Sequence, residues 1–525
     1  MSQRVAVVGA GPGGLSCAML LAASGMEVTI FESQPIIGGR TARIELPSER
    51  GTYAFDRGPT FFLMPYVLEE IFEATGRDLH EHATLTRLDP MYRLLLGRDG
   101  GREDGDPISL DCTQDMSEMA RRIGEIDHED GQNFERFMND NRAKLRRMEP
   151  VLRKPMRGPL DLTNIETAKA LPHINPHLSV HQLLKRYFIN KYVQRAVSFQ
   201  SKYLGMSPHE CPSMFTILPF IEYEYGIWHP KGGCNALMRT MADVLVDMGA
   251  SIHTSTPVER ITFGGQTATG VVVGGQKQRF DHVVVNADAP WAIKNLVPKD
   301  VRWGMVSDEA IDRKRYSCST AMLYLGVEGG VDLPHHTIYV TGKYDDNLAD
   351  IADRGRLSDD PSMYVCNPTV TDPSMAPDGD SALYLLLPTP NCRVGEANGL
   401  DWSREAGPTR ERMLDQLERV FGVSDIRSRI RAEQMLTPND WRSDNILFGA
   451  TFNMAHNLLQ MLHRRPHSEL NGTRNCWLVG GGTHPGSGLP VIFLSSQTTA
   501  GLICERAGID GVSIQHRSLE EAAAV

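Results

Sequence analysis

The sequence lacks the features of a secreted, membrane-spanning or nucleic-acid-binding protein. Its nine cysteines are scattered and never form a Cys-x-x-Cys pair, which argues against a disulfide framework or a zinc site and predicts reduced thiols. No apolar run approaches the roughly 18 residues of a spanning helix. The net charge of −11 leaves no basic excess to neutralise phosphates, so nucleic acid is not an expected partner. A strand follows the first residues directly, so we expect no signal peptide and a cytoplasmic protein.

Familiar catalytic and metal-binding patterns are also missing. The chain holds no Ser-His-Asp arrangement with a nucleophile elbow and no His-Glu-x-x-His. Histidines gather at 80–82 and at 173–181, but both stretches are polar and rich in turn residues, so we interpret these side chains as solvated. The sequence therefore predicts no metal site.

A complete strand–turn–helix–strand pattern opens the chain. The β-branched run Arg4–Val8 predicts a buried parallel strand, LSCAMLLAASG predicts a helix, and EVTIFE predicts a second strand that ends on Glu32. The first turn, GAGPGG, matches G-x-G-x-x-G, whose glycines allow a tight turn, close approach of a pyrophosphate and close helix packing. An acidic residue at the end of the second strand would accept hydrogen bonds from a ribose. The pattern predicts dinucleotide binding through Gly9, Gly11, Gly13, Gly14 and Glu32.

Two further glycine-containing turns follow this unit. QPIIGGRTAR places Gly39 and Arg40 in a loop that can return to the pyrophosphate, where Arg40 would supply positive charge. YAFDRGPTFFLMP predicts a strand that ends in a turn at Gly58, Pro59 and Thr60. The Glu-x5-Gly-Gly-Arg run followed by FDRGPT resembles the large family of FAD-dependent amine oxidases and carotene desaturases. That resemblance implies FAD as the cofactor and places both turns in its flavin-binding domain.

Later strand-rich stretches predict that the chain returns twice to the dinucleotide domain. SIHTSTPVERITF, TGVVV and FDHVVVNADAPW form one return, and CWLVGGG supplies one last buried strand. In the resembled family, the segment around Val258 reaches the adenine side of FAD. We therefore expect the fold class α/β with an α+β insertion: a Rossmann-type FAD-binding domain assembled from discontinuous segments, plus a substrate-binding domain. The expected boundaries are 1–90, 230–300 and 470–510 for the FAD-binding domain, 91–229 and 301–469 for the substrate-binding domain with a membrane-facing helical region, and 511–525 for a flexible tail.

The C-terminal half carries a more specific resemblance. TPNDWRSDNILFGATFNMAHNLLQMLHRRP and CWLVGGGTHPGSGLPVIFLSS resemble bacterial-type phytoene desaturases and the related dehydrosqualene (diapophytoene) desaturases. SFQSKYLGMSPHECPSMFTILPFIEYEYGIWHPKGG and PTVTDPSMAPDG resemble the same group, so the resemblance covers nearly the whole chain. It implies that the last glycine-rich loop runs beside the flavin ring and that a helix starting there points at the ring. The contact residues implied in this loop are Gly481, Gly488, Leu489, Pro490 and Val491.

The resemblance implies flavin-dependent dehydrogenation of an apolar polyene, phytoene or diapophytoene, in carotenoid biosynthesis. A hydride from an allylic C–H would go to flavin N5 and a proton would leave the neighbouring carbon, with oxygen or a quinone as final acceptor. The catalytic residues are unknown; Asp56 and His484 are candidate proton acceptors only by proximity to the expected flavin loops. The implied substrate dissolves in a lipid bilayer. We therefore expect peripheral association with the cytoplasmic membrane, through an amphipathic stretch such as His181–Val197. An ordinary packed helix is the alternative interpretation of that stretch, and the oligomeric state stays open.

Other functions remain as alternatives. A related carotenoid isomerase, saturase or terminal oxygenase would share these motifs. An amine oxidase generally has a Gly-Glu pair in the final flavin loop, where this chain has Thr483 to Gly486. A non-enzymatic relative such as a Rab-escort protein or a GDP-dissociation inhibitor has lost FAD contacts, whereas the N-terminal glycines, Glu32 and Arg40 are all present here.

Overall fold

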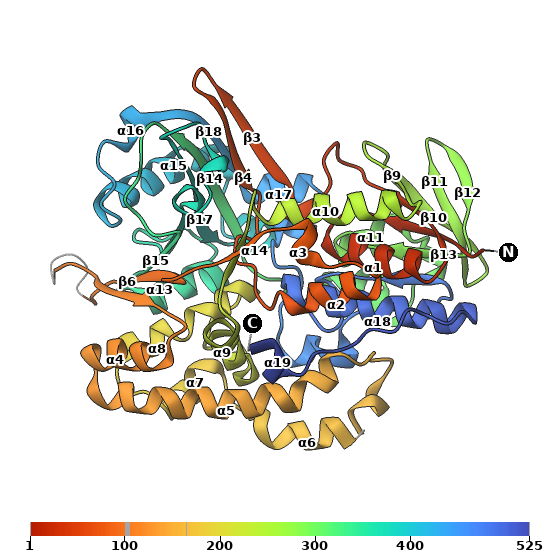
Figure 1. Cartoon of the computed structure of the whole chain (residues 1–525), viewed down its shortest axis with the longest axis horizontal. Helices are drawn as coiled ribbons and strands as arrows, with labels where there is room; N and C mark the ends of the chain where they lie inside the picture. Colours follow the sequence, from red (N-terminus) through yellow and green to blue (C-terminus); the bar gives the residue numbers. More distant parts are fainter. Residues whose placement is uncertain (1, 100–104, 164, 524–525) are drawn as a thin grey trace.

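A five-stranded parallel sheet forms the centre of one half of the molecule. The computed structural model describes residues 2–99, 105–163 and 165–523 (Figure 1). The strands lie in the order β19-β13-β1-β2-β9, and all four pairings are parallel. The central strands β1 and β13 are short, rich in valine and almost fully buried, as expected for a parallel sheet covered on both faces. Their bounds are β1 Arg4–Val8, β2 Glu27–Phe31, β9 Ser251–His253, β13 His282–Val285 and β19 Cys476–Leu478.

The two faces of this sheet pack against different layers. Alternate side chains of β1 point to opposite faces: Val5 and Val7 join the core under the helices, whereas Ala6 and Val8 join a second core. The helices α1 (Pro12–Ala23), α10 (Cys234–Asp247) and α18 (Leu489–Ala507) cover the first face. The second face meets an antiparallel sheet and α11; their bounds are β10 Val258–Gly264, β11 Thr267–Val273, β12 Gln276–Arg279 and α11 Ala289–Leu296.

The predicted α/β fold with a discontinuous dinucleotide-type unit is confirmed. Strands near the N-terminus, in the middle of the chain and near the C-terminus pair in one sheet, and Figure 1 shows their red, green and blue segments together beside α1 and α18. The exact domain boundaries stay a prediction.

A seven-stranded mixed sheet forms the other half, in the order β18-β14-β17-β16-β15-β6-β7. Its pairings are antiparallel except β15 with β6. A hairpin of β3 (Arg43–Ser48) and β4 (Gly51–Asp56) leaves the first half and packs on this sheet through Tyr53 and Phe55. The sheet's bounds are β6 Tyr92–Leu96, β7 Ile108–Cys112, β14 Ser319–Val327, β15 His336–Val340, β16 Met363–Cys366, β17 Ser381–Thr389 and β18 Ile430–Leu436.

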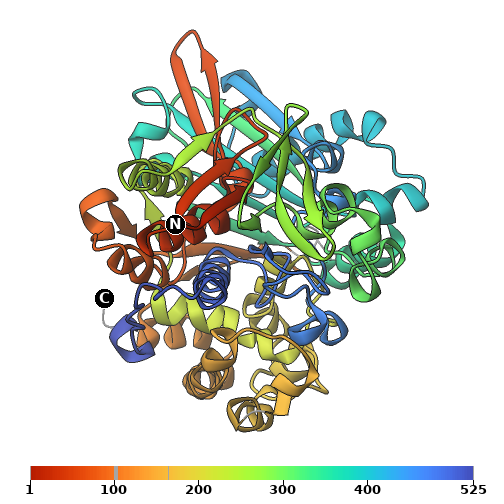
Figure 2. The ribbon, with the colours of Figure 1, turned by 90° about the vertical axis from the view of Figure 1, so that its right-hand side faces the viewer.

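A helical region lies below both sheets in Figures 1 and 2. It contains α4 (Met116–Ile126), the long α5 (His128–Leu152), α6 (Ile165–Ile174) and α9 (Ile217–Tyr225). The stretch His181–Val197, which we considered as one amphipathic surface helix, is instead divided between α7 (Val180–Leu184) and α8 (Lys191–Ala196). No helix in the described part of the chain combines the length and apolar composition needed to cross a membrane.

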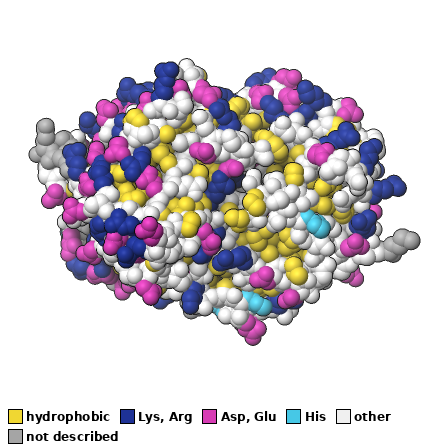
Figure 3. Space-filling model, turned by 90° about the horizontal axis from the view of Figure 1, so that it is seen from above, with side chains coloured by type: hydrophobic (Ala, Val, Ile, Leu, Met, Phe, Trp, Pro, Cys, Tyr) yellow, Lys and Arg dark blue, Asp and Glu magenta, His cyan; other side chains and the backbone are white. Residues whose placement is uncertain are grey.

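The C-terminal segment packs on the rest of the chain. The segment that we predicted as a flexible tail lies against α2 over its described part: the backbone N–H of Arg517 donates to the buried Glu70, and Leu519 is buried. The face seen in Figure 3 mixes acidic and basic side chains, so neither sign of charge dominates it. The other bounds are α2 Tyr66–Ala74, α3 Leu79–His82, α12 Asp308–Asp312, α13 Tyr344–Ala349, α14 Cys392–Ala397, α15 Trp402–Arg419, α16 Ile426–Arg429, α17 Pro438–Ser443, α19 Leu519–Ala523, β5 Leu85–Arg87 and β8 Trp228–Pro230.

Candidate functional site

The turn between β1 and α1 requires glycine at two positions. Gly9 has φ +101°, and a Cβ there would lie 2.7 Å from the carbonyl oxygen of Asn286. A Cβ on Gly14 would collide with the carbonyl oxygen of Gly9 and lie 2.9 Å from the side-chain nitrogen of Asn286. The chain can therefore turn sharply and bring α1 against the end of β13 only with glycine at these two positions.

The N-terminus of α1 presents free backbone N–H groups. Gly11 is the N-cap and makes no side-chain capping bond within the described chain, and the first turn contains no acidic residue. Pro12 occupies a first-turn position, where its missing N–H removes no helical bond. The unsatisfied N–H groups and the helix dipole favour a bound anion at this end.

Glu32 holds the glycine turn from the opposite side. Its carboxylate is buried and accepts hydrogen bonds from the backbone N–H groups of Ala10 and Gln34, each at 2.8 Å. Its own carbonyl oxygen accepts from Thr256 N–H at 2.7 Å, two residues before Val258. These bonds hold the carboxylate against the glycine turn and tie the segment before Val258 to the end of β2.

Arg40 lies over the glycine turn because its loop is tied there. The N–H of Gly38 donates to the carbonyl oxygen of Ala10 at 2.8 Å. The Nη2 atom of Arg40 donates to Asp288 Oδ2 at 3.1 Å, whereas its buried Nε has no hydrogen-bond partner among the described residues. Burial raises the pKa of Asp288, and Arg40 opposes that rise. Arg40 therefore keeps one unused donor for an anion at the turn.

The turn after β4 is packed against Arg40. A Cβ on Gly58 would lie 2.6 Å from the carbonyl oxygen of Arg40, and the hydroxyl of Tyr384 donates to the carbonyl oxygen of Gly58 at 2.8 Å. The buried Thr60 hydroxyl lies 2.7 Å from that of Tyr364. Residues 58–60 thus join the dinucleotide-type unit to the seven-stranded sheet.

The C-terminal glycine loop lies beside the N-terminal one. A Cβ on Gly13 would lie 3.3 Å from the Cα of Gly480, and the Ser496 hydroxyl on α18 donates to the carbonyl oxygen of Gly13 at 3.0 Å. Helix α18 begins after Gly488, which has φ +115° and no side-chain capping bond in the described chain. A second helix N-terminus with free N–H groups therefore lies near the N-terminal glycine turn.

Gly9, Gly11, Gly13 and Gly14 form the β1–α1 turn, and Glu32, the Arg40 loop and the C-terminal glycine loop contact it. Whether these and the other predicted residues contact a cofactor stays a prediction. The arrangement fits FAD: an uncapped helix end and the unused Arg40 donor suit a pyrophosphate, and the fixed carboxylate of Glu32 suits a ribose. The second uncapped helix end, at α18, suits the electron-rich carbonyl edge of a reduced flavin.

Sequence reasoning missed two buried residues that hold the C-terminal loop. Arg465 donates to the carbonyl oxygens of Gly481 at 2.7 Å and Thr483 at 3.1 Å. The ring of His456 accepts the Ser487 N–H at 3.2 Å, and burial lowers the pKa of His456 well below its usual value. No sequence signal pointed to Arg465, which follows Arg464 in a basic stretch, and His456 stands among mixed apolar and polar residues.

The two candidate proton acceptors, Asp56 and His484, are both buried beside backbone groups of the chain. The buried Asp56 carboxylate accepts the N–H groups of Cys234 at 2.9 Å and Asn235 at 3.0 Å, at the start of α10. The buried His484 lies beside the carbonyls of Val151 and Lys154 at the end of α5, and burial lowers its pKa to about 4. Asp56 thus holds the start of α10, and the role of either residue as a proton acceptor stays untested.

Replacing Asp56 with asparagine is expected to change how stability depends on pH. Burial raises the pKa of Asp56 to about 6, so the folded wild type holds this proton longer than the unfolded chain does. As pH rises from about 4 to about 6, the free energy of unfolding of the wild type should therefore fall by about 3 kcal/mol relative to that of Asp56→Asn. Chemical unfolding of both proteins across this range measures the difference. A difference in free energy of unfolding that does not change with pH would contradict the raised pKa of Asp56.

Comparisons with known proteins agree with this geometry. The model of the flavin containing amine oxidoreductase family matches residues 12–504. A 4,4'-diapophytoene desaturase (4,4'-diapolycopene-forming) of Methylomonas sp is 39% identical over 98% of this chain and 98% of its own length. An all-trans-zeta-carotene desaturase of Myxococcus xanthus is 37% identical over 96% of this chain and 94% of its own. The crystal structure of an oxidoreductase from Methanosarcina mazei superimposes with a TM-score of 0.64 at 16% identity, covering 95% of this chain and 100% of that one.

Proposed function

This chain belongs to the flavin containing amine oxidoreductase family, and from that premise we propose that it is an FAD-dependent desaturase of long polyisoprenoid hydrocarbons. The observation that carries the proposal is similarity to two carotene-type desaturases over almost the entire length of all three chains. A match restricted to the dinucleotide unit would support only flavin binding, whereas this one includes the region that would contact the substrate.

When bound, FAD supplies the electron acceptor for the C–H bond that is broken. The chain's own residues hold and orient the cofactor. The N-terminus of α1 and the unused Nε of Arg40 would bind its pyrophosphate, and Glu32 would bind its ribose. The turn at 488–491, with the free N–H groups of α18, would lie beside the ring and favour negative charge there.

A group of aromatic rings extends from the predicted flavin turn into the half of the molecule that contains the seven-stranded sheet. Phe61 follows Thr60 directly, and its ring centroid lies 4.2 Å from that of His336, 5.5 Å from Tyr203 and 5.6 Å from Tyr364. Phe61 and Tyr364 keep part of their surface exposed although they lie between the two halves. The faces of these rings suit a hydrocarbon and would stabilise an allylic cation formed next to them.

Expression in cells that accumulate phytoene, and separately in cells that accumulate diapophytoene, tests the proposal. We expect at least one hydrocarbon to lose pairs of hydrogens and to gain visible absorbance as conjugation lengthens. Mass spectrometry of the extracted pigments measures both changes. An isomerase would change retention without changing mass, and a terminal oxygenase would add oxygen. If both hydrocarbons persist unchanged while the protein is yellow with flavin, the proposed function fails.

We also propose that the chain binds a membrane surface through an exposed apolar strip. Leu160 and Leu459 are 81% and 69% exposed. Their segments are neighbours, because Leu162 and Leu462 pack on the same small core. Arg464, two residues after Leu462, is exposed at the edge of this strip. Exposed leucines with an adjacent basic residue suit an anionic lipid surface.

Changing both leucines to aspartate is expected to release the protein from vesicles. Each leucine that enters the bilayer contributes about 1.5–3 kcal/mol, so the double variant should bind at least tenfold more weakly. Flotation with vesicles of mixed neutral and anionic phospholipid measures binding. Val246→Asp is the matched control, because Val246 is 57% exposed but lies on α10, above the parallel sheet. Equal flotation of all variants would contradict this surface.

A further inference from the structure

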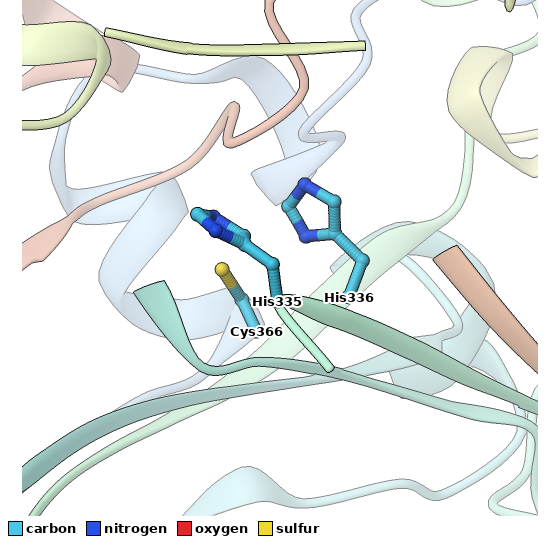
Figure 4. Close-up of side chains that lie close together, drawn as sticks. All are labelled: His335, His336 and Cys366. Atoms are coloured by element: carbon cyan, nitrogen blue, oxygen red, sulfur yellow. The ribbon is translucent and has the colours of Figure 1, made fainter. Parts of the chain in front are cut away.

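Three soft potential ligands meet at one end of the seven-stranded sheet. His336 and Cys366 are directly opposite each other on the antiparallel strands β15 and β16, so their side chains rise from the same face. His335 comes just before β15. In Figure 4, the Cys366 sulfur points toward the ring of His335, and the ring of His336 stands beside them. One potential ligand atom from each residue lies within 4.8 Å of the others, and all three residues are buried.

Hydroxyl groups orient both histidine rings. The Nδ1 atom of His335 lies 2.8 Å from the Thr371 hydroxyl, and that of His336 lies 2.8 Å from the Tyr364 hydroxyl. The Tyr364 hydroxyl can in turn donate to Thr60 at 2.7 Å. If each Nδ1–H donates to its hydroxyl, the proton resides on Nδ1 and the lone pair on Nε2. This is how outer groups fix the tautomer of a metal-bound histidine.

The Nε2 atoms of both rings are buried and have no hydrogen-bond partner among the described residues. Leaving a buried polar atom unsatisfied destabilises the fold, and here two such atoms lie in neighbouring residues. Burial also lowers the pKa of both rings well below the usual value. A ligand that accepts a lone pair would satisfy such an atom.

We propose that His335, His336 and Cys366 form a binding site for a thiophilic transition-metal ion, of which Zn²⁺ is the best match. Two imidazole nitrogens and one thiolate are a ligand set that Zn²⁺ favours, and they leave one position of a tetrahedron for water. The thiolate would offset one of the two positive charges inside the protein. Through the Tyr364–Thr60 contact, the ion would fix the end of β16 against the turn predicted to contact the flavin.

Metal analysis of the untagged, flavin-loaded protein tests this site. After dialysis against Zn²⁺ and removal of free metal, we expect about one Zn²⁺ per chain. Cys366→Ser and His335→Gln should each lower Zn²⁺ affinity by at least tenfold. Thr371→Val keeps all three ligands but removes an orienting hydroxyl, and we expect 10- to 100-fold weaker binding. Cys112→Ser, which removes another buried thiol of the same sheet, should bind Zn²⁺ like the wild type.

A measurement on the wild type covers the case in which a variant fails to fold. Zn²⁺ should slow alkylation of Cys366 by at least tenfold, read by mass spectrometry in mild denaturant, and leave Cys112 unaffected. The proposal is overturned if the wild type binds no Zn²⁺. It is also overturned if Cys366→Ser leaves Zn²⁺ affinity unchanged and Zn²⁺ does not slow the alkylation of Cys366; the cluster would then hold water. Neither readout depends on a polyene, so loss of this site and loss of the proposed desaturase activity are separable.

Discussion

Gly14→Ala is expected to abolish flavin retention and to lower the free energy of unfolding by about 3 kcal/mol. The added methyl group would collide with the carbonyl oxygen of Gly9 and lie 2.9 Å from the Asn286 side-chain nitrogen. The colliding atom is backbone, so no rotamer change can relieve the overlap. Helix α1 must therefore move away from β1, and its free N–H groups leave the position where a pyrophosphate would lie. Flavin absorbance after gel filtration and chemical unfolding measure the two effects.

Gly501→Ala is the matched control for this substitution. Gly501 lies inside α18, which packs on α1, but a Cβ there would meet no atom within 4 Å among the described residues. Alanine is the better helix former by about 1 kcal/mol, so the control should be slightly more stable and stay yellow. If Gly14→Ala retains flavin as well as Gly501→Ala does, the turn is not the pyrophosphate site.

The dinucleotide-type unit could be predicted because its signals are local. The glycine spacing, the β-branched runs and Glu32 all lie within one βαβ unit. The steric limit at Gly14 comes partly from Gly9 in the same turn, although Asn286, far along the chain, also contributes. The return of later strands to the same sheet was predictable for a similar reason, since short, mainly apolar runs such as β13 and β19 need a sheet buried on both faces.

The contacts that the sequence did not reveal join residues that are far apart in the chain. Arg40 meets Asp288, 248 positions later, and His336 faces Cys366 across two strands whose register no local pattern specifies. The stretch His181–Val197 was misjudged as a candidate single helix because its spacing suits a helix, whereas the chain breaks it between α7 and α8 to bury Leu184 and Val193. Tertiary packing decided these cases, and periodicity alone carries no information about it.

Arg465→Met is expected to be the other severe substitution. Arg465 is 1% exposed and donates to the carbonyl oxygens of Gly481 and Thr483, so its removal leaves buried acceptors without donors. Hydrogen bonds from a charged donor contribute about 1.5–3 kcal/mol each, and we expect the free energy of unfolding to fall by about 3 kcal/mol. Because both carbonyls belong to the loop that precedes α18, flavin should also dissociate at least tenfold faster, measured by its fluorescence on release.

Two further variants separate charge from geometry at Arg465. Arg464→Met removes the neighbouring guanidinium, whose side chain is exposed, and should change stability by less than about 0.5 kcal/mol. Arg465→Lys keeps the charge but presents a single ammonium in place of a planar fork, so it should bind one of the two loop carbonyls and recover only part of the loss. Full recovery with lysine would mean that positive charge alone holds the loop. Partial recovery would mean that the fork shape of Arg465 sets the path of the chain from Gly481 into α18, and thereby the direction in which that helix end points.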